Sequence, residues 1–298
     1  MNVLITGSTG QLGQSLNVVI NEYNINDYNF IFVNHDKLDI SNIDQIRQVI
    51  NDNDIDVVIN CAAYTNVDKA ESDYLRAKLV NAYGPKFLAD ELQKRNGFLI
   101  HISTDYVTCG NHYIPIPEII DFHHNPSNIY GQSKLLGEEF ITSAIDKYII
   151  IRTSWLYSEF GKNFLKTIYN KIIDNTPKLN VVDDQIGTPT YAYDLAKAII
   201  EILKTYSSNT SFNHFGIYNY SNEGVCSWYD FAQMIKRIGC KDSKTIINRC
   251  NSKEFPSPVI RPSYSVLDKS KIKETFKNVE IPYWVDSLEN CINKLILI

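Results

Sequence analysis

Short apolar runs alternate with longer amphipathic stretches along the first half of the chain. The runs are rich in Val and Ile and apolar at consecutive positions, which is typical of parallel strands buried on both faces. The predicted strands are Val3–Ile5, Phe30–Val33, Asp56–Asn60, Phe98–Ile102 and Tyr148–Arg152. The predicted helices are Leu12–Ile20, Ile43–Ile50 capped by Ser41, Arg76–Arg95 and one that begins near Tyr130. This alternation predicts an α/β fold of the Rossmann type, with a doubly wound parallel sheet.

The pattern becomes less regular after Ser158. The expected elements are helices at Gly161–Asp174, Tyr193–Leu203, Ser227–Ile238 and Trp284–Leu295, a strand at Leu179–Val182 and a polar surface loop at Tyr206–Asn213. We expect a Rossmann domain formed by residues 1–155 plus about 180–210. A smaller substrate-binding lobe is expected from about 156–179 and 211–298, packed on the carboxyl ends of the strands.

The composition excludes several classes of protein but does not indicate a particular function. The 298 residues are 44% hydrophobic and 21% charged, as in ordinary globular chains. With 29 basic and 34 acidic residues the net charge is −5, and no basic stripe favours nucleic acid or an anionic membrane as a partner. The 6 cysteines show no CxxC spacing, so a zinc site is not indicated. The absence of a secretory signal and of a long apolar run favours a cytoplasmic protein.

A glycine-rich turn follows the first predicted strand and opens the first helix. It contains Gly7, Thr9, Gly10, Gln11, Leu12 and Gly13, in a GxxGxxG pattern. Small residues before a helix N-terminus let a dinucleotide pyrophosphate approach the backbone N–H groups closely. The alternative is a tight turn that only packs the helix against the strand. After the second strand, residues 34–37 contain both an acid and bases, so NADH and NADPH both stay open.

Tyr130 and Lys134 are four residues apart at the start of a predicted helix, so both side chains lie on one helix face. A nearby ammonium is expected to lower the pKa of the phenol, which suits a general acid for a ketone. Ser103–Asp105 ends the fourth predicted strand, where such sheets bind ligands, and Thr104 is placed to hydrogen-bond the same carbonyl. With 19 tyrosines this spacing also arises by chance, but its position one loop after Ser103–Asp105 favours the functional interpretation.

Longer segments carry a resemblance to a known family. They are Asn60–Glu71, Ser103–Val107, Arg152–Tyr157, Gly161–Phe164, Asp184–Thr190, Cys226–Trp228 and Arg261–Pro262. Together with the glycine turn and the Tyr–Lys pair, they make the chain resemble, nearly end to end, the dTDP-4-dehydrorhamnose reductase family of extended short-chain dehydrogenases/reductases. The resemblance implies that NADPH or NADH reduces the C4 ketone of a nucleotide-linked 6-deoxy-4-ketohexose.

The resemblance also implies roles for individual residues. Tyr130 would protonate the C4 oxygen of the sugar, while Lys134 would hold the nicotinamide ribose and tune Tyr130. Thr104 and Asp105 would contact the substrate near the reacting carbonyl, and Trp155 would pack on the sugar or nucleotide. The implied cofactor contacts are Gly10, Gln11 and Leu12 at the pyrophosphate, Asp39 and Ile40 at the adenine end, and Ala62, Ala63, Tyr64 and Thr65 at the inner half.

Four positions depart from the family pattern. Thr108 replaces a Phe that is usual in the family and is followed by Cys109, so the loop over the substrate is expected to differ. Some relatives bind magnesium at a dimer interface through glutamates at places occupied here by Ser15 and Tyr193. We therefore expect no metal, and a monomer or a weak homodimer.

Several alternatives stay open at this point. Trp155 has a simpler interpretation as a core aromatic, and Asp39 as the start of a turn. The sequence does not distinguish dTDP from UDP, so a reductase of a UDP-linked 2-acetamido-2,6-dideoxy-4-ketohexose is a second candidate. The third is a non-catalytic subunit that resembles the regulatory subunit of methionine adenosyltransferase. The intact set of Thr104, Tyr130 and Lys134 argues against this third function.

Overall fold

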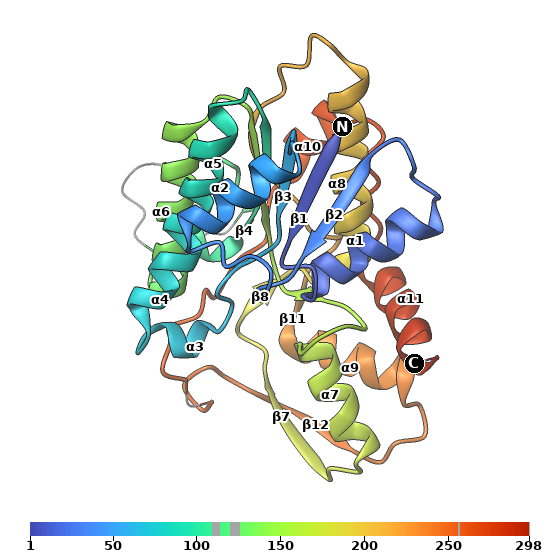
Figure 1. The fold of residues 1–298 in the computed structure, drawn as a ribbon. Coiled ribbons are helices and arrows are strands. Elements are labelled where there is room, and N and C mark those ends of the chain that lie inside the picture. The colour runs from blue at the N-terminus through green and yellow to red at the C-terminus, as the bar shows by residue number, and fades with distance from the viewer. Residues whose placement is uncertain (109–113, 120–125, 256, 298) are drawn as a thin grey trace.

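Six parallel strands form the central sheet, in the order β10-β5-β4-β3-β1-β2. The structure is a computed structural model that describes residues 1–108, 114–119, 126–255 and 257–297. The strands are β1 (Asn2–Thr6), β2 (Asn29–Val33), β3 (Val57–Asn60), β4 (Phe98–Thr104), β5 (Tyr148–Thr153) and β10 (Gly216–Asn219). Helices cover both faces, and the strands run with their carboxyl ends toward a smaller lobe (Figure 1). The predicted doubly wound fold of the Rossmann type is confirmed.

The two faces of the sheet bury alternate residues of the same strands. Val3 and Ile5 pack with residues of α1 and α8, whereas Leu4 packs on the other face with residues of α2, α5 and α6. Because both faces are covered, the strands need consecutive apolar residues, which is the pattern seen in the sequence. The helices around the sheet are α1 (Gln11–Glu22), α2 (Ile43–Asp52), α3 (Val67–Ala70), α4 (Tyr74–Lys78), α5 (Gly84–Gln93), α6 (Ile129–Ala144), α8 (Ala192–Ser208) and α10 (Ser270–Thr275), with the π-helix η1 (Leu79–Tyr83) and the 3-10 helix η2 (Asp105–Val107).

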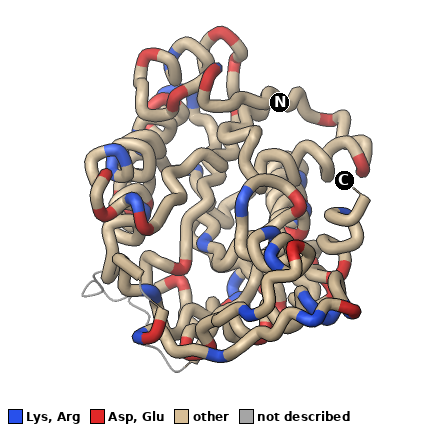
Figure 2. Tube along the Cα trace, turned by 90° about the horizontal axis from the view of Figure 1, so that it is seen from below, with Lys and Arg blue, Asp and Glu red and all other residues tan. Residues whose placement is uncertain are grey.

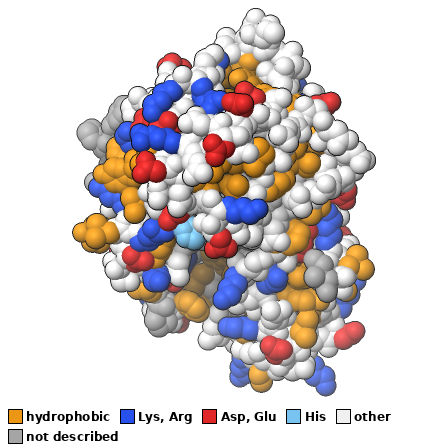
Figure 3. All heavy atoms as spheres, in the orientation of Figure 1, with side chains coloured by type: hydrophobic (Ala, Val, Ile, Leu, Met, Phe, Trp, Pro, Cys, Tyr) orange, Lys and Arg blue, Asp and Glu red, His pale blue; other side chains and the backbone are white. Residues whose placement is uncertain are grey.

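The smaller lobe has a hydrophobic cluster of its own, which includes Leu165, Phe231 and Leu288. Its elements are α7 (Phe164–Ile173), α9 (Trp228–Gly239), α11 (Trp284–Ile296), β6 (Leu156–Tyr157), β7 (Lys178–Val182), β8 (Ile186–Gly187), β9 (Thr190–Tyr191), β11 (Cys226–Ser227) and β12 (Ile246–Cys250). The space-filling view shows the surface hollowed between the body that holds the sheet and this lobe (Figure 3).

The division between sheet and lobe differs from the sequence expectation at two strands. β10, expected in the lobe, pairs with β5 from Gly216↔Ile149 to Asn219↔Arg152 and forms one edge of the central sheet. β7, most of which was assigned to the Rossmann domain, pairs instead with β12 and adds Leu179 to the cluster of the lobe. A short apolar run is compatible with either sheet, because its own residues do not specify which strand lies beside it.

The cap predicted for α2 is wrong by one residue. The side-chain oxygen of Asn42 accepts hydrogen bonds from Asp44 N at 3.0 Å and Gln45 N at 3.2 Å, so Asn42 is the N-cap. Ser41 instead donates its hydroxyl to Asp39 Oδ1 at 2.6 Å. Ser and Asn are both favoured N-cap residues, and adjacent candidates cannot be separated from sequence alone.

Two other elements differ from the prediction. The helix expected over 76–95 is interrupted by the π-helix η1 between α4 and α5. The loop expected at 206–213 begins as the last turn of α8, and its aromatic residues are not at the surface of a polar loop. The rings of Tyr206 and Phe212 lie 4.4 and 6.3 Å from that of Phe98, which is fully buried. Polar residues between the two rings conceal this packing in the sequence.

Basic and acidic residues are interspersed along the trace (Figure 2). Among the described residues, no helix combines the length and hydropathy that a membrane span requires. The cysteines at 61, 226, 240, 250 and 291 are free thiols. Cys109 lies outside the described residues.

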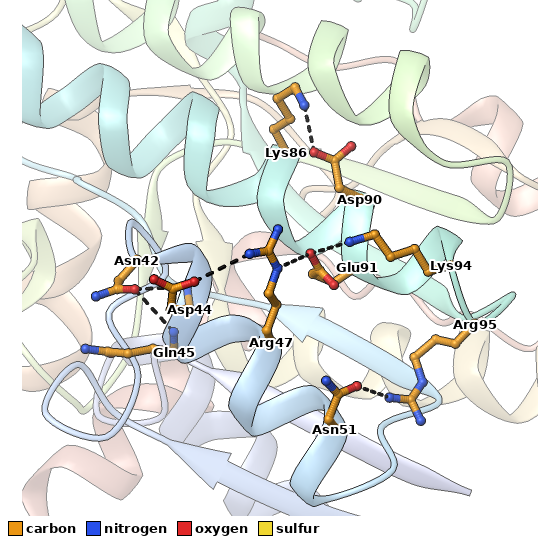
Figure 4. Close-up of polar contacts among 10 residues, drawn as sticks. All are labelled: Asn42, Asp44, Gln45, Arg47, Asn51, Lys86, Asp90, Glu91, Lys94 and Arg95. Atoms are coloured by element: carbon orange, nitrogen blue, oxygen red, sulfur yellow. Dashed lines mark hydrogen bonds and ion pairs between the residues drawn. The ribbon is translucent and has the colours of Figure 1, made fainter.

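An ion-pair network joins α2 to α5 (Figure 4). Arg47 Nε donates to Glu91 Oε1 at 2.9 Å, and Lys94 Nζ donates to the same oxygen at 2.7 Å. Burial opposes ionisation of Glu91, but the two cations hold the pKa of this carboxyl below its usual value. Because Glu91 is 8% exposed, this pair is less screened than an ordinary surface pair.

We expect Glu91→Gln to lower the free energy of unfolding by about 1 kcal/mol at low salt, and by less at high salt. The difference should disappear as the pH falls through the folded-state pKa of Glu91, where the wild-type carboxyl also becomes neutral. Urea titrations at two salt concentrations and a series of pH values measure it. Asp44→Asn, on an exposed partner of Arg47, is the matched control. An equal loss in that variant would contradict the prediction.

Candidate active site

The glycine turn lies at the carboxyl end of β1, next to β3, where the order of the strands reverses. Gly7 has a φ of 64°, and a Cβ at this position would lie 2.8 Å from Ala62 N. A Cβ at Gly13 would lie 2.5 Å from Gly7 O. The turn, the first turn of α1 and the loop after β3 thus approach one another too closely for side chains. No side chain of the described residues caps α1 at Gly10, so its first N–H groups are available to an anion.

Asp39 and Ile40 lie between β2 and α2. Asp39 Oδ1 accepts hydrogen bonds from Ser41 N and Oγ, and Arg76 NH2 donates to Asp39 Oδ2 at 3.1 Å. Burial opposes ionisation, but these partners leave the pKa of Asp39 below its usual value. Asp39 therefore stabilises the turn before α2, which agrees with its interpretation as the start of a turn. Ile40 is buried. Residues 35–37 next to this turn are exposed and carry both charges, so they do not distinguish NADH from NADPH.

The loop after β3 is held by an asparagine of the π-helix. Asn81 Oδ1 accepts from Tyr64 N at 2.8 Å, and Asn81 Nδ2 donates to Tyr64 O and to Ser133 Oγ, both at 3.0 Å. Ser133 belongs to α6, so one buried amide joins this loop to the helix that carries Tyr130. In the same loop after β3, Ala62 and Ala63 are half-buried and Thr65 is exposed. π-Helices are often found at functional sites, and here the extra residue places Asn81.

Tyr130 lies in the first turn of α6, with its phenol against the end of β4. The Thr104 side chain lies next to this phenol, and the Tyr106 ring meets the Tyr130 ring edge-on at 5.6 Å. Burial raises the pKa of Tyr130, and the neighbouring Thr104 hydroxyl opposes the rise only partly. The prediction that Lys134 lowers the pKa of Tyr130 is therefore wrong. Desolvation of the phenol dominates, and Lys134 Nζ forms its hydrogen bonds with other groups. The proximity of Thr104 and Tyr130 agrees with the sequence prediction.

Lys134 is 1% exposed and lies beneath Tyr130 on α6. Its Nζ donates to Ile102 O at 2.6 Å and lies 3.0 Å from His101 Nε2. Burial lowers the pKa of Lys134 to about 8, with the charge of Glu138 acting in the opposite direction. Burial and then the charge of Lys134 hold the pKa of His101 well below its usual value, so this imidazole is neutral at pH 7.

Asp105 is buried directly after Thr104. Its Oδ1 accepts from Thr104 Oγ1 at 3.0 Å, while Oδ2 has no partner of hydrogen-bonding geometry among the described residues. Burial raises the pKa of Asp105 to about 6, and the Ser265 and Thr104 hydroxyls oppose the rise. A buried carboxyl oxygen without a donor is costly, and a ligand hydroxyl would satisfy it.

Trp155 follows β5 with a φ of 47°, which is uncommon for a residue other than glycine. Its ring is half-buried and stacks on Trp228 of the lobe, with ring centroids 3.6 Å apart and an interplanar angle of 9°. Gly187 lies against the same ring, where a Cβ would come within 2.6 Å. Trp155 is therefore part of the packing of the lobe at the edge of the predicted site. Its contact with a substrate stays a prediction.

A side chain of the glycine turn reaches into the lobe. Gln11 Oε1 accepts from Asn163 Nδ2 at 2.8 Å and from Ser158 Oγ at 3.1 Å. On the opposite side, Arg261 NH2 donates to Asp68 Oδ1 at 2.9 Å. These contacts join the glycine turn to the lobe, and the segment at 261 to α3.

A sequence model of the family described as RmlD substrate binding domain matches residues 1–297. The chain belongs to this family. A dTDP-4-dehydrorhamnose reductase of Aggregatibacter actinomycetemcomitans is 36% identical over 292 residues, which cover 97% of each protein.

Two solved structures agree with the fold over nearly its full length. A dTDP-4-dehydrorhamnose reductase of Clostridium acetobutylicum has a TM-score of 0.90 and 37% identity, and the match covers 99% of this chain and 100% of that one. One of Bacillus anthracis, solved in complex with NADP, has a TM-score of 0.88 and 36% identity, with 98% and 99% covered. The resemblance inferred from the motifs is confirmed.

Two of the positions that depart from the family pattern, Thr108 and Tyr193, form hydrogen bonds within the protein. Tyr193 donates its hydroxyl to Glu22 Oε2 at 2.6 Å, and Ser15 is buried. In the described ranges, no group of three or more acidic, His or Cys side chains could hold a metal ion. Thr108 donates its hydroxyl to Asp105 O at 2.8 Å and so closes the turn after β4. The loop beyond it, from Cys109 to 113, is outside the described residues.

Sequence reasoning missed three buried polar residues of the candidate site. They are Asn60, Asn81 and His101, all fully buried. The available signal was a polar residue within an apolar run, as with His101 in the predicted strand Phe98–Ile102. Such a residue must find partners when buried, but the sequence does not show which ones.

Proposed function

We propose that this protein reduces the C4 ketone of a nucleotide-linked 6-deoxy-4-ketohexose with NADPH or NADH, as a reductase of the dTDP-4-dehydrorhamnose type. The observation that supports it best is the Tyr130 phenol, which lies beside the Thr104 hydroxyl at the carboxyl end of the sheet. Full-length relatives named as dTDP-4-dehydrorhamnose reductases, at 36–37% identity, support the same reaction class.

The residues at the glycine turn fit a dinucleotide. The turn offers an uncapped helix N-terminus and two positions without room for a Cβ, which are the properties a pyrophosphate requires. The residues that would hold the cofactor are Gly7, Thr9, Gly10, Gln11, Leu12, Gly13, Asp39, Ile40, Ala62, Ala63, Tyr64, Thr65, Tyr130 and Lys134. When bound there, the nicotinamide supplies hydride to the C4 carbon.

In the proposed reaction, Tyr130 donates its phenolic proton to the C4 oxygen as charge develops on it. Its raised pKa keeps this proton in place until then. Thr104, whose hydroxyl donates to Asp105 Oδ1 in the free protein, turns this hydroxyl to the same oxygen and orients it. Lys134, as an ammonium, stabilises the tyrosinate that remains. Asp105 accepts a hydroxyl of the sugar at its unpartnered Oδ2.

The substrate is proposed to lie between the sheet and the lobe, which is built on the second hydrophobic cluster. Trp155 would pack on the sugar or the nucleotide. We further propose a cytoplasmic enzyme that acts as a monomer or weak homodimer, without nucleic acid or membrane partners. The even mixture of charges and the free thiols among the described residues support these points.

Measuring the oxidation of NADPH and of NADH by the fall in their absorbance tests this function. We expect a kcat/KM for dTDP-4-dehydrorhamnose at least about tenfold above that for a UDP-linked 2-acetamido-2,6-dideoxy-4-ketohexose. The reverse preference would favour the second substrate class. Absence of turnover with both sugars, together with a stable protein partner, would favour the regulatory function instead.

A further inference from the structure

Four buried side chains form a line of hydrogen bonds that ends at Lys134. Thr6 Oγ1 donates to Asn60 Oδ1 at 2.7 Å. Asn60 Nδ2 lies 3.0 Å from His101 Nδ1, and His101 Nε2 lies 3.0 Å from Lys134 Nζ. Each of the four residues is at most 1% exposed. Water therefore does not replace a missing partner, and the direction of each bond is set by the protein.

The orientation of the Asn60 amide decides these directions. Its Oδ1 accepts from the backbone Ala62 N–H at 3.2 Å as well as from the Thr6 hydroxyl. A reversed amide would set its NH2 group against the Ala62 N–H, which would keep only its contact to Thr6 Oγ1 at 3.3 Å, and would remove the acceptor of the Thr6 hydroxyl. The Thr6 hydroxyl would then be a buried donor without a partner, which is costly. The NH2 group of Asn60 therefore points at His101, and His101 Nδ1 is the acceptor.

A neutral imidazole carries one N–H, so an accepting Nδ1 places the proton on Nε2. Nε2–H then points at Lys134 Nζ. An amine can accept this hydrogen bond through its lone pair, whereas an ammonium has no acceptor and would place donor against donor. Lys134 keeps a hydrogen bond to Ile102 O in either state. The bond from His101 therefore favours the uncharged amine.

We propose that Asn60 and His101 are positioning residues that favour the uncharged amine of Lys134 in the free protein, and that binding of the cofactor shifts Lys134 toward the ammonium with net uptake of protons. The inference rests on the proposed function only for the identity of the ligand. The proton comes from solvent, and no bond to carbon changes. The ribose hydroxyls can accept from an ammonium, and the negative pyrophosphate favours the charged form.

The charges around Lys134 are compatible with this proposal. Glu138, one turn along α6, favours the ammonium but is neutralised by Arg152 of β5, with Glu138 Oε2 and Arg152 NH2 2.6 Å apart. The remaining titratable groups of α6 are Tyr130 and the exposed Glu139. The elements packed against α6 carry further titratable groups, which are Asp105 and Tyr106 on η2, Asp68, Lys69, Glu71 and Asp73 on and after α3, Tyr74, Arg76 and Lys78 on α4, Tyr83 on η1, Lys86, Asp90 and Glu91 on α5, and Tyr148 on β5.

The tautomer of His101 is measured directly by long-range ¹H–¹⁵N NMR of protein labelled at histidine. His101→Gln assigns the signal. If that variant does not fold, substitution of the other histidines in turn assigns it by elimination. We expect a neutral ring protonated at Nε2, and in Asn60→Asp, whose carboxylate accepts, a ring protonated at Nδ1. A wild-type ring protonated at Nδ1 or at both nitrogens would overturn the proposal.

Calorimetry of NADPH or NADH binding at pH 8.5, in buffers of different ionisation enthalpy, counts the protons taken up. The wild type should take up between half a proton and one proton per site. Lys134→Arg, which is charged throughout, should bind without uptake. Binding without uptake in the wild type would overturn the proposal. Failure of both dinucleotides to bind would contradict the proposed function instead, and the NMR result would still decide the state of His101.

Discussion

Tyr130→Phe is expected to lower kcat by about 10²–10⁴-fold, because the substitution removes only the hydroxyl that donates the proton to the C4 oxygen. Affinity for the cofactor should stay within about twofold, since the ring and its edge-on contact with Tyr106 are kept. Steady-state kinetics with the keto-sugar measure the first effect, and fluorescence titration with NADPH measures the second.

Tyr106→Phe is the matched control, because it makes the same chemical change in the neighbouring ring. The Tyr106 hydroxyl accepts from Arg261 NH1 at 3.3 Å, so its loss affects the segment at 261 rather than the proton donor. We expect less than about a tenfold fall in kcat. If Tyr130→Phe kept more than a tenth of the wild-type kcat, the assigned acid would be wrong.

Arg152→Met is expected to lower the free energy of unfolding by about 3–5 kcal/mol, because it leaves Glu138 buried without its counter-ion. Glu138 is held by Arg152 Nε at 3.0 Å and by Ser103 Oγ at 2.5 Å, and the side chains of Arg152 and Glu138 are 4% and 3% exposed. Urea or thermal unfolding measures the loss.

The double variant Glu138→Met/Arg152→Met should lose less stability than Arg152→Met alone, because no buried charge remains unpaired. Arg47→Met on the surface is the control for the loss of an arginine, and about 1 kcal/mol is expected there. Equal losses in the single and double variants would show that packing, rather than charge pairing, accounts for the effect.

The fold was predictable because its information is local. Consecutive apolar residues at Val3–Ile5 are all buried only if helices cover both faces of the sheet. Glycines are needed at positions 7 and 13 because other backbone segments lie too close there for a Cβ. β10 was placed in the wrong unit because its pairing with β5 joins segments 67 residues apart at Gly216 and Ile149. A four-residue strand does not specify such a distant partner.

The site was predictable in its residue types but not in its electrostatics. The spacing of Tyr130 and Lys134 placed them on one helix, yet it did not show that Lys134 turns to His101 and Ile102. The sign of the pKa shift of Tyr130 was missed for the same reason. Burial depends on the surrounding tertiary structure, and its cost exceeds the effect of a lysine whose Nζ bonds elsewhere.

The stacked indoles of Trp155 and Trp228 give the protein an optical reporter at the edge of the proposed site. The chain has 3 tryptophans, and the third, Trp284, meets the Phe231 ring edge-on instead. Parallel indoles 3.6 Å apart couple their electronic transitions, so the pair should dominate the near-ultraviolet circular dichroism spectrum. One indole follows the central sheet and the other belongs to the lobe. Relative displacement of the two parts would therefore change this spectrum in unlabelled protein, during binding or catalysis, without any chromophore from outside.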